Sequence, residues 1–487
     1  MSYENARHRG RLLNIDVAAD LFGSYSTEKK MGAVKQVLAG SDTPIYLTPE
    51  FIGCDDNRNV YNMPFLLNDD GTPWWEANAY LCYLVENKHV MSRPTDDARR
   101  KAARLLDYKL FTEDEGFDWL DFSGRRLSSR PTYRYFYYLC EIRALSAASV
   151  NQYTSDVYSF YEYTSRSWHP ESIQMERVDS VKTIRVYYQS YKYSSSREVL
   201  KRSQTKRTPG TSKIPTGYVR EDGEVLRPLN VEQISELKKI VNGSSWEPIE
   251  RLIVLFSLLT GARKQTVLTI RLRHIRMLSD MEPQSDGSYK LQVGPGTLIN
   301  TKNSKKHNIY IPSQLRTELI IYGHCEQSRK RREKFKLKYR MEYPGLPEFE
   351  EDDLYLFMSD QGNCYYMATD DPRHPIVKSR PSGQVVDNLK RKIFRGATDN
   401  FPRDFYYHWL RATYAFLLWL GLQKSIDSGT LSESEALSFI QNRLSHKSRE
   451  TTENYLKLFK NIDVQFMAQE LFEDILFSGS MMDNDQR

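Results

Sequence analysis

Residues 444–455 read LSHKSRETTENY and contain the pattern L-x-H-x-S-x-x-T-T-x-x-Y, in which His446 precedes Tyr455 by nine positions. The chain has 32 tyrosines, so one tyrosine carries little information on its own. This stretch becomes informative because it is the last member of an ordered set of four short motifs.

A helical segment precedes this stretch. RDFYYHWLRATYAFLLWLGL, residues 403–422, places His408 and Arg411 three positions apart, and on a helix such residues share one face. The imidazole and the guanidinium therefore converge on one point, while the apolar run at 415–422 anchors the helix in a core. A surface histidine–arginine pair would have the same pattern.

The other two motifs lie further upstream. In LLTGAR, residues 258–263, an apolar helix ends at Gly261, which can take the positive φ of a helix stop, and Arg263 begins the next helix. In TKNSKK, residues 301–306, lysines occupy the turn of a predicted hairpin with strands KLQV and NIYIP. Both features are ordinary in isolation.

Taken together, the four motifs resemble the tyrosine recombinase (phage integrase) family. In chain order they are T-G-x-R, a hairpin lysine, H-x-x-R and the final histidine–tyrosine motif. The resemblance covers about residues 228–460 and extends more loosely to a core-binding domain at 95–193. It implies that Tyr455 is the nucleophile, and that the remaining catalytic residues are Arg263, Lys302, His408, Arg411 and His446. Lys305 and Lys306 on the same turn are alternatives to Lys302.

These residue types suit phosphodiester chemistry. Two arginines present planar forks of N–H donors to the phosphate oxygens and stay charged at any working pH, so we expect neither a metal nor another cofactor. A tyrosine phenol has a pKa of about 10 and needs a partner such as His408 to lose its proton. A hairpin lysine can protonate the leaving 5′-oxygen, and His446 can donate a hydrogen bond to the phosphate. The phosphotyrosine keeps the bond energy, so religation needs no ATP.

The chain departs from the family at several positions. An acid is common three residues after the first arginine, where this chain has Thr266, so the carboxylate that would brace the site is missing or supplied elsewhere. Ser445 replaces the usual glycine before the second histidine. Two insertions are also expected, one around KSIDSGTLSESEALSF and one spanning RKRREKFKLKYR and EFEEDD.

We predict a mainly α-helical protein with a small β-hairpin or sheet, in which a helical core-binding domain precedes a mixed α/β catalytic domain. The expected divisions are an accessory domain at 1–94, the core-binding domain at 95–193, a basic linker at 194–227 and the catalytic domain with a tail helix at 228–478.

The net charge of +6 is modest, but basic residues gather in two segments, 194–220 and 329–340. Dense basic segments in a near-neutral chain are typical of polyanion-binding proteins, although solvated surfaces can look the same. In the first segment we expect DNA contacts from Lys201, Arg202, Lys206 and Arg207.

Composition excludes several classes of protein. The longest apolar stretches have eight residues, too few to span a bilayer, and the N-terminus lacks the apolar region of a secretory signal. Five dispersed cysteines give no zinc-ligand pattern. We therefore expect a cytoplasmic protein, and the resemblance implies that it is bacterial and joins the nucleoid when it binds DNA.

The function implied is a site-specific recombinase or integrase of a mobile element that acts on double-stranded DNA. A homotetramer on synapsed DNA and an accessory DNA-bending or directionality protein are the expected partners, and a tail stripe would dock on a neighbouring subunit (Val464, Met467, Leu471, Ile475). The alternatives are a type IB topoisomerase, a telomere resolvase, a non-catalytic DNA-binding relative and a metal-dependent DDE-type transposase.

Overall fold

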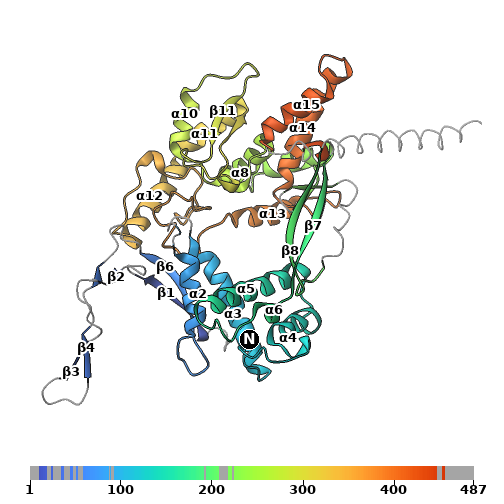
Figure 1. Cartoon of the computed structure of the whole chain (residues 1–487). Coiled ribbons are helices and arrows are strands. Elements are labelled where there is room, and N and C mark those ends of the chain that lie inside the picture. The colour runs from blue at the N-terminus through green and yellow to red at the C-terminus, as the bar shows by residue number, and fades with distance from the viewer. Residues whose placement is uncertain are drawn as a thin grey trace, which may run out of the picture. The chain divides into compact units, whose positions relative to one another are not determined.

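The computed structural model describes residues 10–18, 24–25, 34–37, 44–47, 51–52, 59–86, 88, 93–190, 193–207, 218–221, 224–446 and 452–455. The chain divides into two compact units, Met1–Ser212 and Lys213–Arg487. Both are mainly helical, and each sheet among the described residues is a two-stranded antiparallel pair, which confirms the expected fold class (Figure 1).

The first unit combines short strand pairs with a helical bundle. Its strands are β1 (Leu12–Ala18), β2 (Ser24–Tyr25), β3 (Val34–Val37), β4 (Pro44–Leu47), β5 (Phe51–Ile52), β6 (Val60–Leu66), β7 (Val181–Ser190) and β8 (Tyr193–Arg202). They pair as β1–β6, β2–β5, β3–β4 and β7–β8. Its helices are α2 (Trp75–Val85), α3 (Pro94–Asp114), η2 (Leu127–Ser129), α4 (Pro131–Tyr137), η3 (Tyr138–Ile142), α5 (Ala147–Ser167) and α6 (Met175–Val178).

One core joins the β1–β6 pair to the helices of this unit. Helix α5 starts at Ser146, whose hydroxyl accepts a hydrogen bond from the Ser149 amide at 3.2 Å and so caps the helix. Phe160 on α5 packs edge-on against Trp74, just before α2, with ring centroids 5.3 Å apart. Strands β1 and β6 and helix α2, before residue 94, share this core with the helices that follow it.

The described part of the expected linker at 194–227 includes strands that belong to both units. Residues of β8 pair with β7 through a ten-residue antiparallel register, from Val181↔Arg202 to Ser190↔Tyr193. After β8 the chain docks on the bundle, because buried Gln204 donates to the Val178 carbonyl at 2.6 Å. The basic residues that suggested an extended linker therefore belong largely to a folded ribbon and its anchor.

The second unit is built around helices. Its strands are β9 (Val219–Glu221), β10 (Glu224–Leu226), β11 (Tyr289–Val293) and β12 (His307–Ile311). Its helices are α7 (Val231–Val241), α8 (Pro248–Thr260), α9 (Lys264–Leu268), α10 (Leu272–Asp280), η4 (Lys302–Ser304), α11 (Ser313–His324), α12 (Glu326–Glu342), η5 (Glu351–Asp353), α13 (Val385–Gly396), α14 (Trp409–Asp427) and α15 (Glu433–Leu444).

Helices α8 and α14 form the centre of this unit's core. Helix α8 is apolar on most sides, as a helix surrounded by protein should be. It ends at Gly261, which has φ +67°, and a Cβ there would lie 2.5 Å from the ring of Tyr414 on α14. The predicted helix stop is therefore confirmed, and glycine is needed both for the backbone and for the close approach of α14.

The predicted hairpin is also confirmed, since β11 and β12 pair from Tyr289↔Ile311 to Val293↔His307. Beyond it, α12 and the following loops form a satellite core around Phe335 and Tyr355, in the region of the expected insertion that spans RKRREKFKLKYR and EFEEDD. None of the described helices combines the length and apolarity needed to cross a membrane.

Candidate functional site

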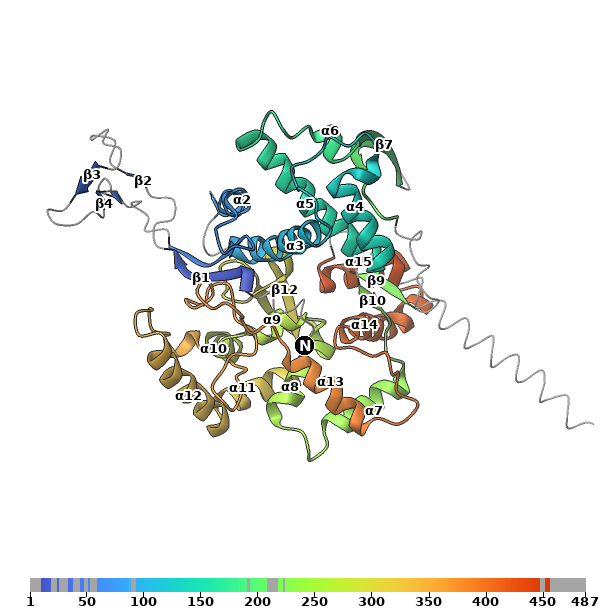
Figure 2. The ribbon, with the colours of Figure 1, turned by 90° about the horizontal axis from the view of Figure 1, so that it is seen from below.

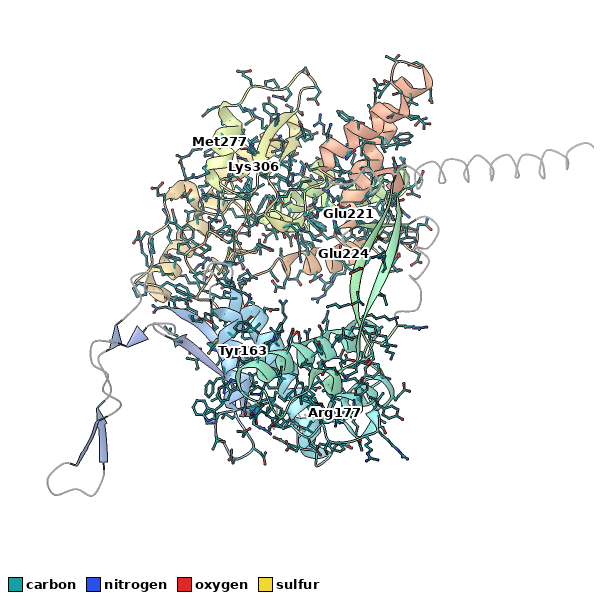
Figure 3. The ribbon with its side chains drawn as sticks, in the orientation of Figure 1. Tyr163, Arg177, Glu221, Glu224, Met277 and Lys306 are labelled. Atoms are coloured by element: carbon teal, nitrogen blue, oxygen red, sulfur yellow. The ribbon has the colours of Figure 1, made fainter. Side chains whose placement is uncertain are left out.

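Five parts of the second unit meet at one site. The β9–β10 hairpin lies beside α14 (Figure 2), and the other contributors are the turn between α8 and α9, the end of α15 and the short helical segment 452–455. Glu221 and Glu224, both on this hairpin, are labelled in Figure 3. We call the group at its centre the anion cluster, which comprises Glu221, Arg263, Arg411, His446 and Tyr455.

Arg411 is held rigidly in this cluster. It is one turn into α14 and 5% exposed. Its guanidinium donates to the carbonyls of Gly261 and Leu444, both at 2.7 Å, and its Nε donates to Glu221 Oε1 at 2.9 Å. Three acceptors from three separate segments thus fix the plane of the guanidinium.

Arg263 approaches the same carboxylate from the other side. It caps the N-terminus of α9, directly after the Gly261 stop, and its Nη2 donates to Glu221 Oε1 at 2.7 Å. Its side chain is 23% exposed, so this guanidinium is the more accessible of the two.

Glu221 accepts from nearly every member of the cluster. Its Oε1 receives both arginines and lies 3.3 Å from His446 Nε2, and its Oε2 accepts from the Tyr455 hydroxyl at 2.6 Å. Burial alone would raise the pKa of Glu221, but the charges of Arg411, His446 and Arg263 hold the pKa far below its usual range. The residues identified by spacing therefore enclose one fixed negative charge.

Tyr455 is fully buried, and its ring stacks on that of His446 with centroids 5.7 Å apart. Burial and the neighbouring Glu221 charge raise the pKa of this phenol well above its ordinary value. Burial lowers the pKa of His446 despite the opposing charge of Glu221, and its Nδ1 lies 3.1 Å from Thr452 Oγ1. Tyr455 is thus a protonated hydrogen-bond donor.

His408 has a carboxylate partner of its own. It stands at the N-terminus of α14, and its Nδ1 contacts Glu224 on β10. Burial lowers the pKa of His408 against the opposing effect of Glu224. Its buried Nε2 has no hydrogen-bond partner among the described residues, so the Glu224 contact leaves that nitrogen available to a substrate.

A cavity of about 390 Å³ opens beside the cluster. Arg263, His408, Arg411 and Lys302 all line it. Of the other hairpin lysines, Lys305 is directed at the Ser445 carbonyl, and Lys306 is exposed. Lys302 lines this cavity and a smaller adjoining one, whereas Lys305 lines only the smaller one.

Two departures from the family pattern have structural explanations. Thr266, at the position where an acid is common, donates to the Asn300 carbonyl at 3.0 Å, and the carboxylate comes instead from Glu221. Ser445 has φ +54°, a left-handed conformation that a glycine would adopt without strain.

Sequence reasoning missed three residues of this site: Glu221, Glu224 and His307, which lines a smaller adjoining cavity with Arg263 and Arg411. A signal for the first two existed. Asp-Gly at 222–223 between two short strand-like runs is a strong hairpin signature, and the register pairs Glu221 with Glu224 across it.

The expected DNA-binding residues of the first unit divide into two pairs. Arg202 donates to the Thr154 carbonyl at 2.7 Å, and Lys206 donates to the Leu145 carbonyl at 2.9 Å, so both anchor the chain to the bundle. Lys201 and Arg207 are exposed. DNA contacts from these four residues stay a prediction.

The second basic segment also has a structural role. On α12, seven of the eight basic side chains pair with acids, in the pairs Arg329–Glu333, Lys330–Glu326, Arg331–Glu247, Arg332–Glu351, Lys336–Glu351, Lys338–Glu342 and Arg340–Glu348. The helix therefore presents little net charge, contrary to the expectation of a polyanion-binding segment.

No group of three or more His, Cys, Asp or Glu side chains that could hold a metal ion is found among the described residues. The predicted tail stripe from Val464 to Ile475 lies outside them.

No protein-family model and no curated protein matches the sequence. Among solved structures, the chain is similar to the Tn1549 transposon integrase in complex with circular intermediate DNA, with 12% identity, a TM-score of 0.36 and coverage of 78% of this chain and 94% of that one. It is similar to the XerH site-specific recombinase bound to a palindromic difH substrate, with 16% identity, a TM-score of 0.37 and coverage of 80% of this chain and 87% of that one. It is also similar to the XerA recombinase, with 14% identity, a TM-score of 0.28 and coverage of 80% of this chain and 98% of that one. Such TM-scores say nothing by themselves about activity.

Proposed function

We propose that this chain cuts and rejoins DNA strands through a phosphotyrosyl intermediate at Tyr455, as a site-specific recombinase of the tyrosine recombinase type. The observation that supports it is the anion cluster, in which a buried carboxylate accepts hydrogen bonds from Arg263, Arg411 and Tyr455. A site that holds one anion with two guanidiniums and a tyrosine hydroxyl has the donors that a phosphodiester requires.

In this proposal the scissile phosphate takes the place of the Glu221 carboxylate between the two arginines. The carboxylate is a planar anion and the phosphate is a tetrahedral one, and both offer oxygen acceptors. The same N–H and O–H donors can therefore bind either group. The phosphate gains charge in its transition state, whereas the carboxylate does not, and the fixed guanidiniums therefore stabilise the reacting species most.

Displacement of Glu221 also frees the nucleophile. The Tyr455 hydroxyl loses its bond to Glu221 Oε2, which together with burial raises its pKa in the DNA-free chain. The phenol then faces a phosphate flanked by two cations. DNA binding and activation of Tyr455 are thereby one event.

The chemical step transfers a phosphoryl group. Tyr455 Oη bonds to phosphorus, the bond from phosphorus to the 5′-oxygen breaks, and the cleaved strand ends in a 3′-phosphotyrosyl link. The phenol proton passes to His408, whose Nε2 is available, and the leaving 5′-oxygen takes a proton from Lys302. Attack of a new 5′-hydroxyl reverses these transfers and reseals the strand.

The test uses a pool of suicide duplexes nicked near random sites, incubated with the full chain in EDTA and resolved on denaturing gels. We expect a covalent protein–DNA adduct that Tyr455→Phe abolishes. Tyr355→Phe is the matched control. The buried hydroxyl of Tyr355 lies outside the site, where it donates to Asp371 at 2.7 Å, so this variant should retain the adduct. Circular dichroism verifies that both variants fold.

Four results would speak against the proposal. An adduct that persists in Tyr455→Phe means that another tyrosine attacks, and an adduct lost with chelator means a metal-dependent reaction. DNA binding without any adduct favours a non-catalytic relative. Relaxation of supercoiled plasmid by a monomer, without strand exchange, would favour the topoisomerase alternative.

The proposal extends to the setting of the reaction. We expect integration or excision of a mobile element, a homotetramer on synapsed DNA and an accessory DNA-bending protein. The first is tested by sequencing the trapped DNA, and the second by the mass of the complex on that site.

A further inference from the structure

The β7–β8 ribbon of the first unit lies outside the unit's core. Its two ten-residue strands form one long hairpin that extends beyond the helices of its unit (Figure 1), and none of the ribbon side chains that the structure describes belongs to that core. A two-stranded hairpin with no covering layer is marginally stable in water. The ribbon therefore gains from a partner.

The base of the ribbon is anchored firmly. Arg202 donates to the Thr154 carbonyl at 2.7 Å and to the Thr154 hydroxyl at 3.1 Å. The next residue, Ser203, donates through its hydroxyl to Asp179 at 2.6 Å. The ribbon is thus a fixed projection of the bundle and not a loose linker.

The two faces of the ribbon differ in charge. On one face, Lys182 lies directly opposite Lys201, both are exposed, and the next pair is Ile184 and Val199. Neither lysine has an acidic partner among the described residues. Like charges directly opposite each other destabilise a strand pair, so this face is best satisfied by an anion.

The other face is neutral. Arg185 pairs with Glu198 across the strands at 3.0 Å, and beside them Leu200 is 70% exposed opposite Thr183. The unbalanced positive charge of the described side chains is therefore confined to the lysine face.

We propose that the β7–β8 ribbon is a DNA-contact element that lays its lysine face along duplex DNA; this inference rests on the proposed function. Ten residues at about 3.3 Å each give a ribbon roughly 33 Å long, close to one helical turn of the duplex. The major groove admits a two-stranded ribbon, and Lys182 and Lys201 at its base then reach the flanking phosphates.

The experiment measures the affinity of the full chain for a labelled random 40-bp duplex over a range of salt concentrations. The variant Lys182→Gln/Lys201→Gln removes two charges from the ribbon. We expect its plot of log affinity against log salt to flatten by about 1–2, since each phosphate contact contributes about 0.9.

The matched control is Lys238→Gln/Lys239→Gln on α7, which removes the same charge from two exposed positions. A second variant joins Ile184 to Val199 through Asn-Gly, which shortens the ribbon but keeps both lysines. It should fold normally and bind DNA several-fold more weakly than the control.

Equal salt slopes and affinities for the ribbon variants and the control would overturn the inference. So would a ribbon variant that changes only self-association in light scattering, since the ribbon would then meet a second protein chain. If the wild type forms no adduct but the ribbon variants still flatten the salt slope, the DNA-contact role stands and the strand-cleavage proposal falls.

Discussion

The second unit contains two buried clusters with the same ingredients. Besides the anion cluster it has an insertion cluster, which comprises Arg271, Tyr355, Asp370, Asp371 and Arg373. Each has two arginines and a tyrosine whose hydroxyl donates to a carboxylate, at 2.6 Å in the anion cluster and at 2.7 Å in the insertion cluster.

Their charge balance differs. The insertion cluster has one aspartate for each arginine, and the ring of Tyr355 lies 3.7 Å from the Arg271 guanidinium carbon. The anion cluster sets two arginines against the single carboxylate of Glu221, beside an open cavity. In a balanced buried network each charge already has its partner. Where fixed cations are in excess, a substrate anion can replace the carboxylate that they bind.

The largest expected effect separates the arginines of the two clusters. Arg263→Ala should lower the rate of adduct formation about 10²–10³-fold at saturating DNA, because one of the two phosphate donors is lost. Arg373→Ala should instead destabilise the protein by about 3–5 kcal/mol, since it leaves Asp371 buried without its partner.

Adduct kinetics and thermal unfolding of both variants check this difference. If Arg373→Ala slows the adduct per folded molecule as much as Arg263→Ala does, charge balance is not what distinguishes the two clusters.

An intermediate effect is expected when each carboxylate is neutralised. Glu221→Gln should bind DNA about 10-fold or more tightly, because the competing anion is removed and a charge-assisted hydrogen bond contributes about 1.5–3 kcal/mol. Asp371→Asn should leave DNA affinity unchanged. Both should unfold at lower temperature than the wild type.

Fluorescence anisotropy with the labelled duplex measures these affinities. A Glu221→Gln protein that binds DNA normally yet forms no adduct would make the carboxylate part of the catalytic machinery and contradict its role as a stand-in for phosphate.

The smallest effect concerns pH. Burial lowers the pKa of His446, so between that lowered value and about 6.5 the unfolded chain binds a proton that the folded chain does not. Stability is complete above about pH 6.5 and declines as the pH falls. Burial would raise the pKa of Asp371, but the neighbouring Arg373 lowers it below its ordinary value. Asp371 therefore loses its contribution to stability only below about pH 4.

Thermal unfolding between pH 7.5 and 5.5 tests this prediction. The His446→Gln protein should lose less stability over this range than the wild type does. Equal losses would place the titrating group elsewhere.

Local patterns in the sequence predicted much of this unit. The helix stop at Gly261, the β11–β12 hairpin and the common face of His408 and Arg411 depend on short-range geometry, whereas the meeting of this pair with Arg263 at one cavity was implied by the family resemblance. Such geometry is fixed by residue spacing and by backbone preferences.

Long-range electrostatics was beyond this reasoning. Glu221 is 190 positions from Arg411 along the chain. It follows directly after the basic segment 194–220, where nothing in the local pattern marks it as a site residue. The α12 lysines and arginines look like a DNA-binding run until partners such as Glu247 and Glu348 are brought to them by the fold.

The central claim is that the anion cluster is where a DNA phosphate becomes covalently linked to the chain. The most direct measurement is to trap the adduct from a suicide duplex, digest both protein and DNA, and locate the phosphotyrosine by mass spectrometry. The account predicts a single modified residue, Tyr455. Modification of Tyr406 or Tyr407, which line the adjoining cavity, or an adduct with no phosphotyrosine, would contradict it.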